Sequence, residues 1–353
     1  MRMKHLISAH SIFFCCLVVA SFLGACRKSA DANVTEPDDP KPKILSFSIS
    51  PSLPTDPFTF SFKGTASNYA DVLWSFGDGT TSYEMSPTHT FLTTGTFKVN
   101  LTARNKLGYW AEQEAQITIR PQDIVNFTSE LQVDGTLKLR AVTPVQIQSY
   151  SWYNGSLVTD PPISTTESAS IPQLTTSNFT LVTLKLKTKN GSEAVYTKMV
   201  TNFGALNDIT ANGVNLTVSN DLAAGPYSSE GSLKLTDGDI TTKFCLTSGY
   251  SSAFWAQQKL KNPAIVNAYV FVSGNDAPDR DPKDWNLQGS TDGVTWVTLD
   301  TRSNITSDVR RETKVYAFNN TTAYNYYRLN ITSIKGGSIM QMSEWRLMST
   351  FKP

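Results

Sequence analysis

Residues 97–103 read Phe-Lys-Val-Asn-Leu-Thr-Ala, so apolar and polar side chains alternate along the whole stretch. Residues 58–62, Phe-Thr-Phe-Ser-Phe, repeat the pattern. Because successive side chains of an extended chain point to opposite faces, a period of two predicts strands with one buried face. Such runs recur between segments rich in Gly, Pro, Asn and Asp. The sequence therefore predicts an all-β protein of three β-sandwich domains in tandem.

The N-terminus has the composition of an export signal. Arg2 and Lys4 precede an apolar run, residues 12–20, which is too short to remain in a membrane as a spanning helix. The following Leu23-Gly24-Ala25-Cys26 resembles the bacterial lipobox, which implies cleavage before Cys26 and acylation of that residue. We therefore expect residues 1–25 to be a lipoprotein signal peptide and Cys26 to be the lipidation site. The alternative is an ordinary signal peptide followed by a chance cysteine.

The segment after Cys26 has a different composition. Residues 27–42 carry three prolines and one large aliphatic residue, Val34. They cannot bury a core, so residues 26–42 are expected to be a flexible tether.

The charge and cysteine content of the mature chain exclude some functions. Removing Arg2 and Lys4 with the signal lowers the basic count from 31 to 29, against 30 acidic residues. This balance argues against nucleic acid as a partner. Once Cys26 is acylated, Cys245 has no second mature cysteine for a disulfide, so the domains must be stabilised by core burial.

Residues 43–120 contain three ordered motifs, Trp74-Ser75-Phe76-Gly77-Asp78-Gly79, Pro87-Thr88-His89-Thr90-Phe91 and the strand from Gly95 to Asn105. In this order and spacing they resemble a polycystic-kidney-disease (PKD) domain, which implies an immunoglobulin-like sandwich. The Gly-Asp-Gly sequence predicts a hairpin turn. His89 is the one histidine of the mature chain. The resemblance implies that His89 is structural, and the alternative is a base or a metal ligand.

Residues 121–204 repeat parts of this pattern more weakly. Trp152 takes the place of Trp74, and residues 184–190 resemble residues 99–105. The acidic turn has become Tyr153-Asn154-Gly155. We therefore expect an Ig-like/PKD-like domain that acts as a spacer.

Residues 205–350 contain three further motifs in order. They are residues 235–244 with Asp237-Gly238-Asp239, residues 281–296, and residues 326–347. Together they resemble the discoidin, or coagulation-factor (F5/8) type C, domain. That resemblance implies a galactose-binding-like jelly roll, in a family that includes many bacterial carbohydrate-binding modules.

The Asp-Gly-Asp loop suggests a metal site. Asp237 and Asp239 flank a glycine, and Thr242 follows on the same loop. Hard oxygen ligands on a tight loop suit calcium. The resemblance implies a structural Ca²⁺ here that is completed by Glu344. The alternative is a plain turn beside a salt-bridged glutamate.

Candidate ligand-binding residues lie in loops, because loops on a rigid scaffold commonly carry binding groups. They are Tyr250 in one loop, and Asn275, Asp276 and Arg280 in another. Charged forks and amides can bind adjacent sugar hydroxyls. Trp255 is instead expected in the core, as the resemblance implies.

An alternative role for the second loop is purely structural. Asp279, Arg280 and Asp281 are adjacent in sequence and could pair with one another. In that case they would brace the loop and would not bind a ligand.

The sequence argues against catalysis. Acids clustered on one loop, residues 276–284, do not face each other across a cleft as glycosidase carboxylates do. His89 is assigned to the first domain, and Cys245 has no nearby base. We therefore expect a protein that is not an enzyme.

The organisation resembles that of surface glycan-binding lipoproteins of Bacteroidetes. This implies an outer-membrane protein, anchored by lipid and displayed on the cell surface, that binds glycan or polysaccharide through its last domain. Other proteins of a glycan-uptake system would be partners. The alternative is an adhesin or assembly component that binds protein or lipid headgroups. Arg27 is not the aspartate that retains some lipoproteins on the inner membrane, but the acidic residues begin to cluster only at Glu36, some distance from Cys26. The sequence therefore leaves open on which face of the outer membrane the protein lies.

Overall fold

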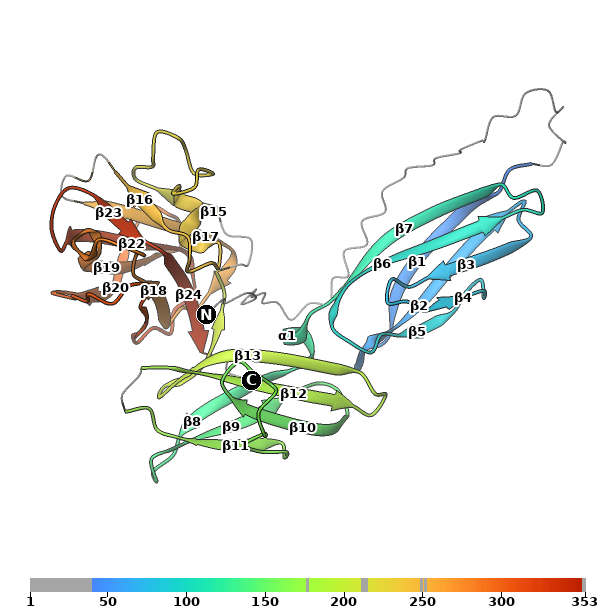
Figure 1. Cartoon of the computed structure of the whole chain (residues 1–353), viewed down its shortest axis with the longest axis horizontal. Helices are drawn as coiled ribbons and strands as arrows, with labels where there is room; N and C mark the ends of the chain where they lie inside the picture. Colours follow the sequence, from blue (N-terminus) through green and yellow to red (C-terminus); the bar gives the residue numbers. More distant parts are fainter. Residues whose placement is uncertain (1–39, 176–177, 211–214, 248–249, 251–252, 351–353) are drawn as a thin grey trace.

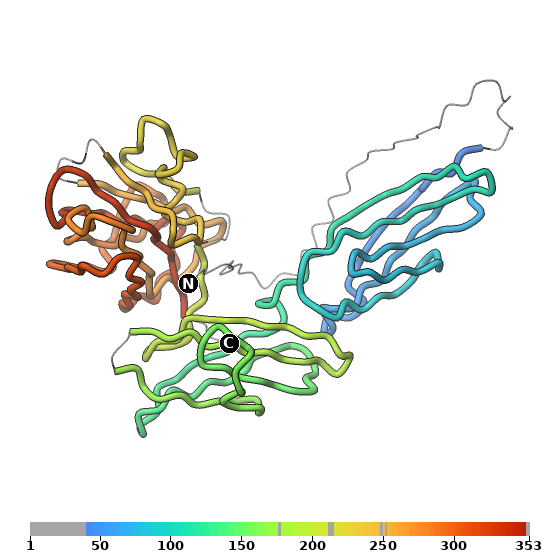
Figure 2. Tube along the Cα trace, in the orientation of Figure 1, coloured from blue at the N-terminus to red at the C-terminus, as the bar shows by residue number. Residues whose placement is uncertain are grey.

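The structure is a computed structural model that describes residues 40–175, 178–210, 215–247, 250 and 253–350. The expected signal peptide, Cys26 and nearly all of the tether lie outside these residues. The regular secondary structure of the described chain is almost entirely β-strand, and the chain forms three lobes (Figures 1 and 2). The predicted all-β class is confirmed. Within these residues no helix is long and apolar enough to cross a membrane.

Lobe 1 (residues 43–119) is a sandwich of two antiparallel sheets. One has the order β1 (Lys43–Leu53), β2 (Asp56–Ser67), β5 (Thr88–Thr90). The other has the order β4 (Thr81–Ser82), β3 (Asp71–Ser75), β6 (Gly95–Arg104), β7 (Trp110–Ile119). Trp74 and Phe76 are both buried between the sheets, where each packs against Phe62.

His89 joins the predicted hairpin turn to strand β5. Its Nε2 lies 2.7 Å from Asp78 Oδ2, and its ring stacks on Phe76 with centroids 4.1 Å apart. The turn requires glycine, because Gly77 has φ +83° and a Cβ there would lie 2.5 Å from the carbonyl oxygen of Lys98. These contacts give His89 the structural role that the resemblance implies.

Lobe 2 (residues 121–201) begins with the single turn α1 (Pro121–Ile124). One sheet has the order β11 (Ser168–Pro172), β9 (Thr136–Val142), β8 (Asn126–Leu131). The facing sheet starts with β10 (Ile147–Asn154), β12 (Thr180–Thr188), β13 (Glu193–Thr201). Trp152 is fully buried between them against Phe127, and its indole N–H donates to the carbonyl oxygen of Thr166 at 2.9 Å.

Lobe 3 (residues 215–350) is a third, larger sandwich. Its five-stranded sheet has the order β15 (Asn215–Val218), β17 (Phe254–Ala264), β22 (Tyr324–Ile334), β19 (Pro282–Ser290), β20 (Val297–Arg302). The facing sheet contains β24 (Glu344–Thr350), β18 (Ala268–Val272) and β21 (Thr313–Ala317). Smaller elements are η1 (Ser232–Thr236), η2 (Pro278–Arg280) and the pair β16 (Phe244–Leu246) with β23 (Met340–Met342).

Lobes 2 and 3 share one sheet. Strand β14 (Gly204–Asp208) pairs with β13 on one edge and with β24 on the other, which produces the seven-stranded order β10-β12-β13-β14-β24-β18-β21. A buried apolar cluster crosses this junction and includes Met199 of lobe 2 with Val270 and Met348 of lobe 3. The predicted boundary at residue 204 therefore falls at the first residue of a strand that both lobes need.

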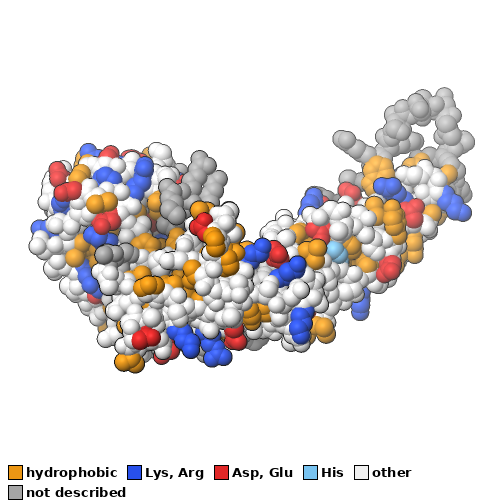
Figure 3. Space-filling model, turned by 60° about the horizontal axis from the view of Figure 1, so that its bottom comes forward, with side chains coloured by type: hydrophobic (Ala, Val, Ile, Leu, Met, Phe, Trp, Pro, Cys, Tyr) orange, Lys and Arg blue, Asp and Glu red, His pale blue; other side chains and the backbone are white. Residues whose placement is uncertain are grey.

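Lobe 1 is also hydrogen-bonded to lobe 2. Glu193 donates its backbone N–H to the carbonyl oxygen of Leu92 at 2.8 Å, and Ser192 Oγ donates to that of Phe91 at 2.8 Å. Lobes 1 and 3 rise from opposite ends of lobe 2 (Figure 1). Basic and acidic side chains are interspersed on the face that Figure 3 shows, in keeping with the near-neutral composition.

Candidate functional site

The loop between β18 and β19, residues 273–281, brings together most of the predicted ligand-binding residues. Asp276 on this loop accepts from Lys243 Nζ at 2.7 Å, and Glu230 lies 3.6 Å from the same ammonium group. The hydrogen bond from Lys243 lowers the pKa of Asp276. Three chain segments therefore converge here, and we call this region the loop-end site.

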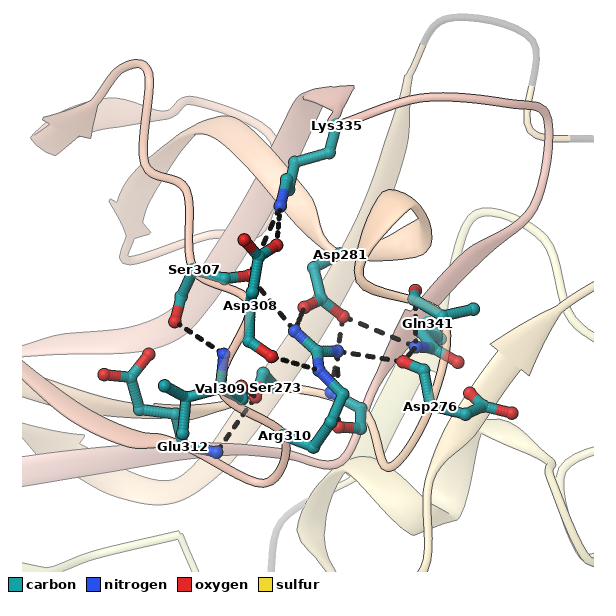
Figure 4. Close-up of polar contacts among 12 residues, drawn as sticks. Ser273, Asp276, Asp281, Ser307, Asp308, Val309, Arg310, Glu312, Lys335 and Gln341 are labelled. Atoms are coloured by element: carbon teal, nitrogen blue, oxygen red, sulfur yellow. Dashed lines mark hydrogen bonds and ion pairs between the residues drawn. The ribbon is translucent and has the colours of Figure 1, made fainter.

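Arg310 fixes the backbone of this loop from below (Figure 4). Its Nη1 donates to the carbonyl oxygen of Asp276 at 2.9 Å, and its Nη2 donates to Asp281 Oδ2 at 2.6 Å. Gln341 Nε2 also donates to the carbonyl oxygen of Asp276, at 2.7 Å. Burial raises the pKa of Asp281, and the hydrogen bond from Arg310 opposes that shift. Sequence reasoning missed Arg310, because it is distant from the loop in the chain.

The alternative in which Asp279, Arg280 and Asp281 brace one another is wrong. Asp281 pairs with Arg310, as described above. Arg280 is half-buried, and among the described residues it forms no ion pair and no side-chain hydrogen bond. Asn275 is exposed, and the Asp276 side chain is 51% exposed. The loop thus presents an amide, a carboxylate and an uncommitted guanidinium on a fixed backbone.

The loop is also sterically constrained at two positions. Gly274 packs so tightly on Gln341 that a Cβ would lie 2.4 Å from its Nε2. Ala277 has φ +27°, an unusual value for a residue with a side chain. A constrained loop loses less conformational freedom when it binds a ligand.

Tyr250 is not an exposed ring, contrary to expectation. It is only 9% exposed and belongs to the core cluster of lobe 3, and burial raises the pKa of its hydroxyl. An aromatic side chain in a loop gains free energy by folding inward when the core has space for it. Tyr250 therefore packs in the core of lobe 3 and does not present an exposed ring.

An exposed aromatic does occur in a neighbouring loop. Tyr227 is 89% exposed, three positions before Glu230, whose carboxylate approaches Lys243 of the loop-end site. Sequence reasoning missed it. The available signal was an aromatic residue directly after the Gly225-Pro226 turn.

The expected core position of Trp255 is also wrong. Phe254 is 1% exposed and fills the core, whereas Trp255 is half-buried on the outer face of β17. Neighbouring residues of a strand point to opposite faces, so an error of one position in the register exchanges inside and outside.

The predicted calcium residues do lie together. Thr242 Oγ1 is 2.9 Å from Asp237 Oδ2 and 3.0 Å from the carbonyl oxygen of Asp239. The Asp239 carboxylate bonds to Thr241, so Asp239 faces Thr242 through its carbonyl group. Glu344 Oε1 accepts from the backbone N–H of Gly238 at 2.8 Å, which brings the glutamate to the same loop.

Glu344 is buried in surroundings that disfavour its charged form. It is 0% exposed, and its Oε2 has no hydrogen bond among the described residues, with Arg346 Nη1 at 3.7 Å. Burial raises the pKa of Glu344 to about 9, and the nearby Asp237 carboxylate adds to the shift. Among the described residues, no group of three or more His, Cys, Asp or Glu side chains is arranged so that these side chains alone could hold a metal ion. Two carboxylates, one hydroxyl and one carbonyl oxygen are nevertheless a donor set that fits Ca²⁺.

Two domain families match the chain. Residues 47–119 match the PKD domain, and residues 215–345 match the F5/8 type C domain. The chain therefore contains a PKD domain in lobe 1 and an F5/8 type C domain in lobe 3, and both predicted resemblances are confirmed.

Curated relatives share only segments with the chain. Collagenase ColA of Bacillus cereus is 35% identical over 109 residues, which are 29% of this chain and 11% of the collagenase. A peptide-N(4)-(N-acetyl-beta-glucosaminyl)asparagine amidase of Arabidopsis thaliana is 50% identical over 50 residues, 14% of this chain and 7% of the amidase. The chain spans about a tenth or less of the length of these relatives.

Two similar solved structures each correspond in length to one part of this chain. One is a family 32 carbohydrate-binding module from Clostridium perfringens in complex with GalNAc-beta-1,3-galactose, with 14% identity and a TM-score of 0.35. The match covers 40% of this chain and 99% of the module. The other is the C-terminal domain of a chitobiase from Bacteroides fragilis, with 14% identity and a TM-score of 0.35. This match covers 41% of this chain and 100% of the domain.

Replacing Arg310 tests whether it holds the loop. We expect Arg310→Ala to lower the free energy of unfolding by about 1–3 kcal/mol, because Asp281 is left buried without its partner. As a control, Arg140→Ala removes an arginine whose side chain is 70% exposed, and it should change the free energy of unfolding by less than about 0.5 kcal/mol. Urea unfolding of both variants measures the difference. Equal effects would contradict the assignment.

Proposed function

We propose that this protein is a non-catalytic surface lipoprotein that binds glycan through its F5/8 type C domain. The observation that carries the proposal is the preorganised loop-end site, where Asn275, Asp276 and Arg280 stand on a backbone fixed by Arg310. An arginine fork and a carboxylate bind adjacent sugar hydroxyls as donor and acceptor, and an amide does both. Tyr227, three positions before Glu230 in the chain, has an exposed ring of the kind that can cover the apolar face of a sugar.

The proposal of a non-catalytic role rests on how candidate groups are used. His89 is bonded to Asp78 and stacked on Phe76. Cys245 is buried, and burial raises the pKa of its thiol, which disfavours the nucleophilic thiolate. Asp276 is paired with Lys243. These groups stabilise the fold or the loop, and none has the arrangement of a nucleophile with its base.

The remaining domains are proposed to act as a spacer. Lobe 2 continues into lobe 3 through β14, so the binding domain is held in one orientation relative to lobe 2. Cys26, as a lipid anchor in the outer membrane, would place lobe 1 nearest the membrane and lobe 3 farthest along the chain.

We also propose that Asp237, Asp239, Thr242 and Glu344 hold a structural calcium ion. The ion would supply the positive charge that the buried Glu344 lacks and would join the loop to β24. The same strand carries Arg346, which pairs with Asp208 of β14. Calcium would thereby stabilise the strand that joins the two lobes.

Glycan binding is tested on the mature chain from residue 27 with Cys26 absent. We expect binding to a subset of glycans on an array, and a loss of about tenfold or more in affinity for Arg280→Ala, since a charged hydrogen bond contributes about 1.5–3 kcal/mol. Arg104→Ala, an exposed arginine of lobe 1, should bind as the wild type does. Absence of binding to every glycan in the presence of calcium would refute the proposal.

Calcium binding predicts a rise in Tm that chelator reverses. At a free calcium concentration of one hundred times Kd, binding stabilises the folded state by about 2.7 kcal/mol. Because the proton and the ion compete for Glu344, whose pKa is raised to about 9, the stabilisation should grow as the pH rises from about 6 to 9. Glu344→Gln should abolish it, whereas Glu230→Gln should not. Calorimetry with and without EDTA measures the Tm of the wild type and of both variants. A wild-type Tm that does not depend on calcium would exclude the site.

The anchor is tested by Cys26→Ser in cells that export the protein. The variant should incorporate no labelled fatty acid and should appear in the soluble fraction, because the acyl chains provide the membrane affinity. Protease added to intact cells should remove lobe 3 of the wild type. Protection of lobe 3 until the outer membrane is broken would contradict surface display.

A further inference from the structure

The outer face of the five-stranded sheet of lobe 3 carries a stack of aromatic and basic side chains. On β22, Tyr327 and Leu329 are buried, so Tyr326 and Arg328 point outward. On β17, Ala256 and Gln258 are buried, so Trp255 points outward. Lobe 2 joins the other sheet of the sandwich, through β24. We call this outward surface the open sheet face.

Arg328 lies between two tryptophans on this face. Its guanidinium carbon is 4.5 Å from the ring centroid of Trp255 and 3.9 Å from that of Trp296. Gln257 Oε1 accepts from Arg328 Nη2 at 2.8 Å and from Nε at 3.3 Å. The stacking on the two indoles and the hydrogen bonds to Gln257 together fix the plane of the guanidinium group. Nη2 uses one N–H for Gln257, and no other hydrogen bond from Nη1 or Nη2 to a described residue is formed. The remaining N–H groups of Nη1 and Nη2 form the fork that binds carboxylate or sulfate with two parallel hydrogen bonds.

No acidic side chain neutralises this arginine. Strands β15, β17 and β22 contain no Asp or Glu, and Arg328 forms no ion pair in the described part of the chain. Burial alone lowers the pKa of Arg328, without an opposing contribution from a carboxylate. Lys259 adds positive charge to the same face, with its ammonium group 5.5 Å from the Tyr326 ring centroid.

The acids of the neighbouring strands are already bonded elsewhere. Asp284 of β19 accepts from Ser333 and from the backbone N–H of Asn304. Asp300 of β20 accepts from the Tyr269 hydroxyl at 2.8 Å and pairs with Arg302. The open sheet face is therefore a positively charged surface with flat aromatic groups, and its central cation lacks a counter-ion.

We propose that the open sheet face is a second glycan-binding surface, selective for acidic polysaccharide. A uronate carboxylate or a sulfate group binds the free edge of Arg328, and the flanking indoles of Trp255 and Trp296 contact the apolar faces of the sugar rings. Outward amides from Gln288 and Asn330, on the rows beside Arg328, bind hydroxyls as donors and acceptors. A linear polymer meets all three kinds of group along an extended, flat sheet.

This surface is separate from the loop-end site. Arg328 pairs with Gln288 in the middle of the sheet, whereas Arg280 lies before β19 begins. The two sites would accordingly respond to different substitutions, and the failure of one proposal leaves the other intact.

Affinity electrophoresis of the mature chain in sodium polygalacturonate, and in the same polymer after methyl esterification, tests the proposal. The two gels differ only in carboxylate charge. We expect strong retardation by the acid form, weak retardation by the ester, and a loss of retardation with added NaCl. Dextran sulfate against neutral dextran tests whether sulfate replaces carboxylate.

The variants separate a specific fork from general charge. Arg328→Gln and Trp296→Ala should each weaken binding to polygalacturonate about tenfold or more. Arg328→Lys keeps the charge but loses the fork and should bind with intermediate affinity. Arg140→Gln, the same charge change at an exposed site of lobe 2, should bind as the wild type does.

Three outcomes would overturn the inference. They are equal retardation of the wild type by both polymers, an equal loss in Arg140→Gln, and unchanged binding by Arg328→Gln. In the last case the stack is purely structural, and a lower Tm would be its only consequence. Each variant is compared by circular dichroism, and Lys259→Gln, at an exposed position, provides a milder change if Arg328→Gln does not fold.

Discussion

Strand β14 is hydrogen-bonded to β13 on one edge and to β24 on the other, and five residues thereby join two sandwiches into one sheet. The constraint is strong because strand edges must be paired or covered, and both neighbouring edges are completed by the same strand. The apolar cluster around Met199, Val270 and Met348 then packs across the junction. Lobe 3 is consequently a fixed extension of lobe 2 rather than a module on a flexible linker.

The proposed calcium loop lies against this junction. Asp208 of β14 pairs with Arg346, Arg346 approaches Glu344, and Glu344 accepts from Gly238 of the loop. A small cavity between the lobes is lined by these same groups together with Ile240. The contacts from Asp208 through Arg346 and Glu344 to Gly238 therefore connect the charged groups of the proposed calcium loop to the strand that joins the two lobes.

Both proposed binding surfaces use rigid backbone to present few uncommitted groups. In the loop-end site, Arg310 and Gln341 immobilise the loop and leave Arg280 without a partner among the described residues. On the open sheet face, Gln257 and two indoles fix Arg328 and leave one edge available. In each case the protein has already lost the entropy that binding would otherwise cost.

The sequence by itself determined the all-β class and the order of the PKD and F5/8 type C domains, because strand periodicity, turn residues and motif spacing are local properties. The structural role of His89 and the approach of Glu344 to the Asp237 loop were implied only by the family resemblances. Tertiary structure decided the partner of Asp281, the burial of Tyr250, the exchange of Phe254 and Trp255 between core and surface, and the double pairing of β14. These depend on which segments meet in space, and a strand shifted by one residue reverses every side chain. No local pattern records that choice.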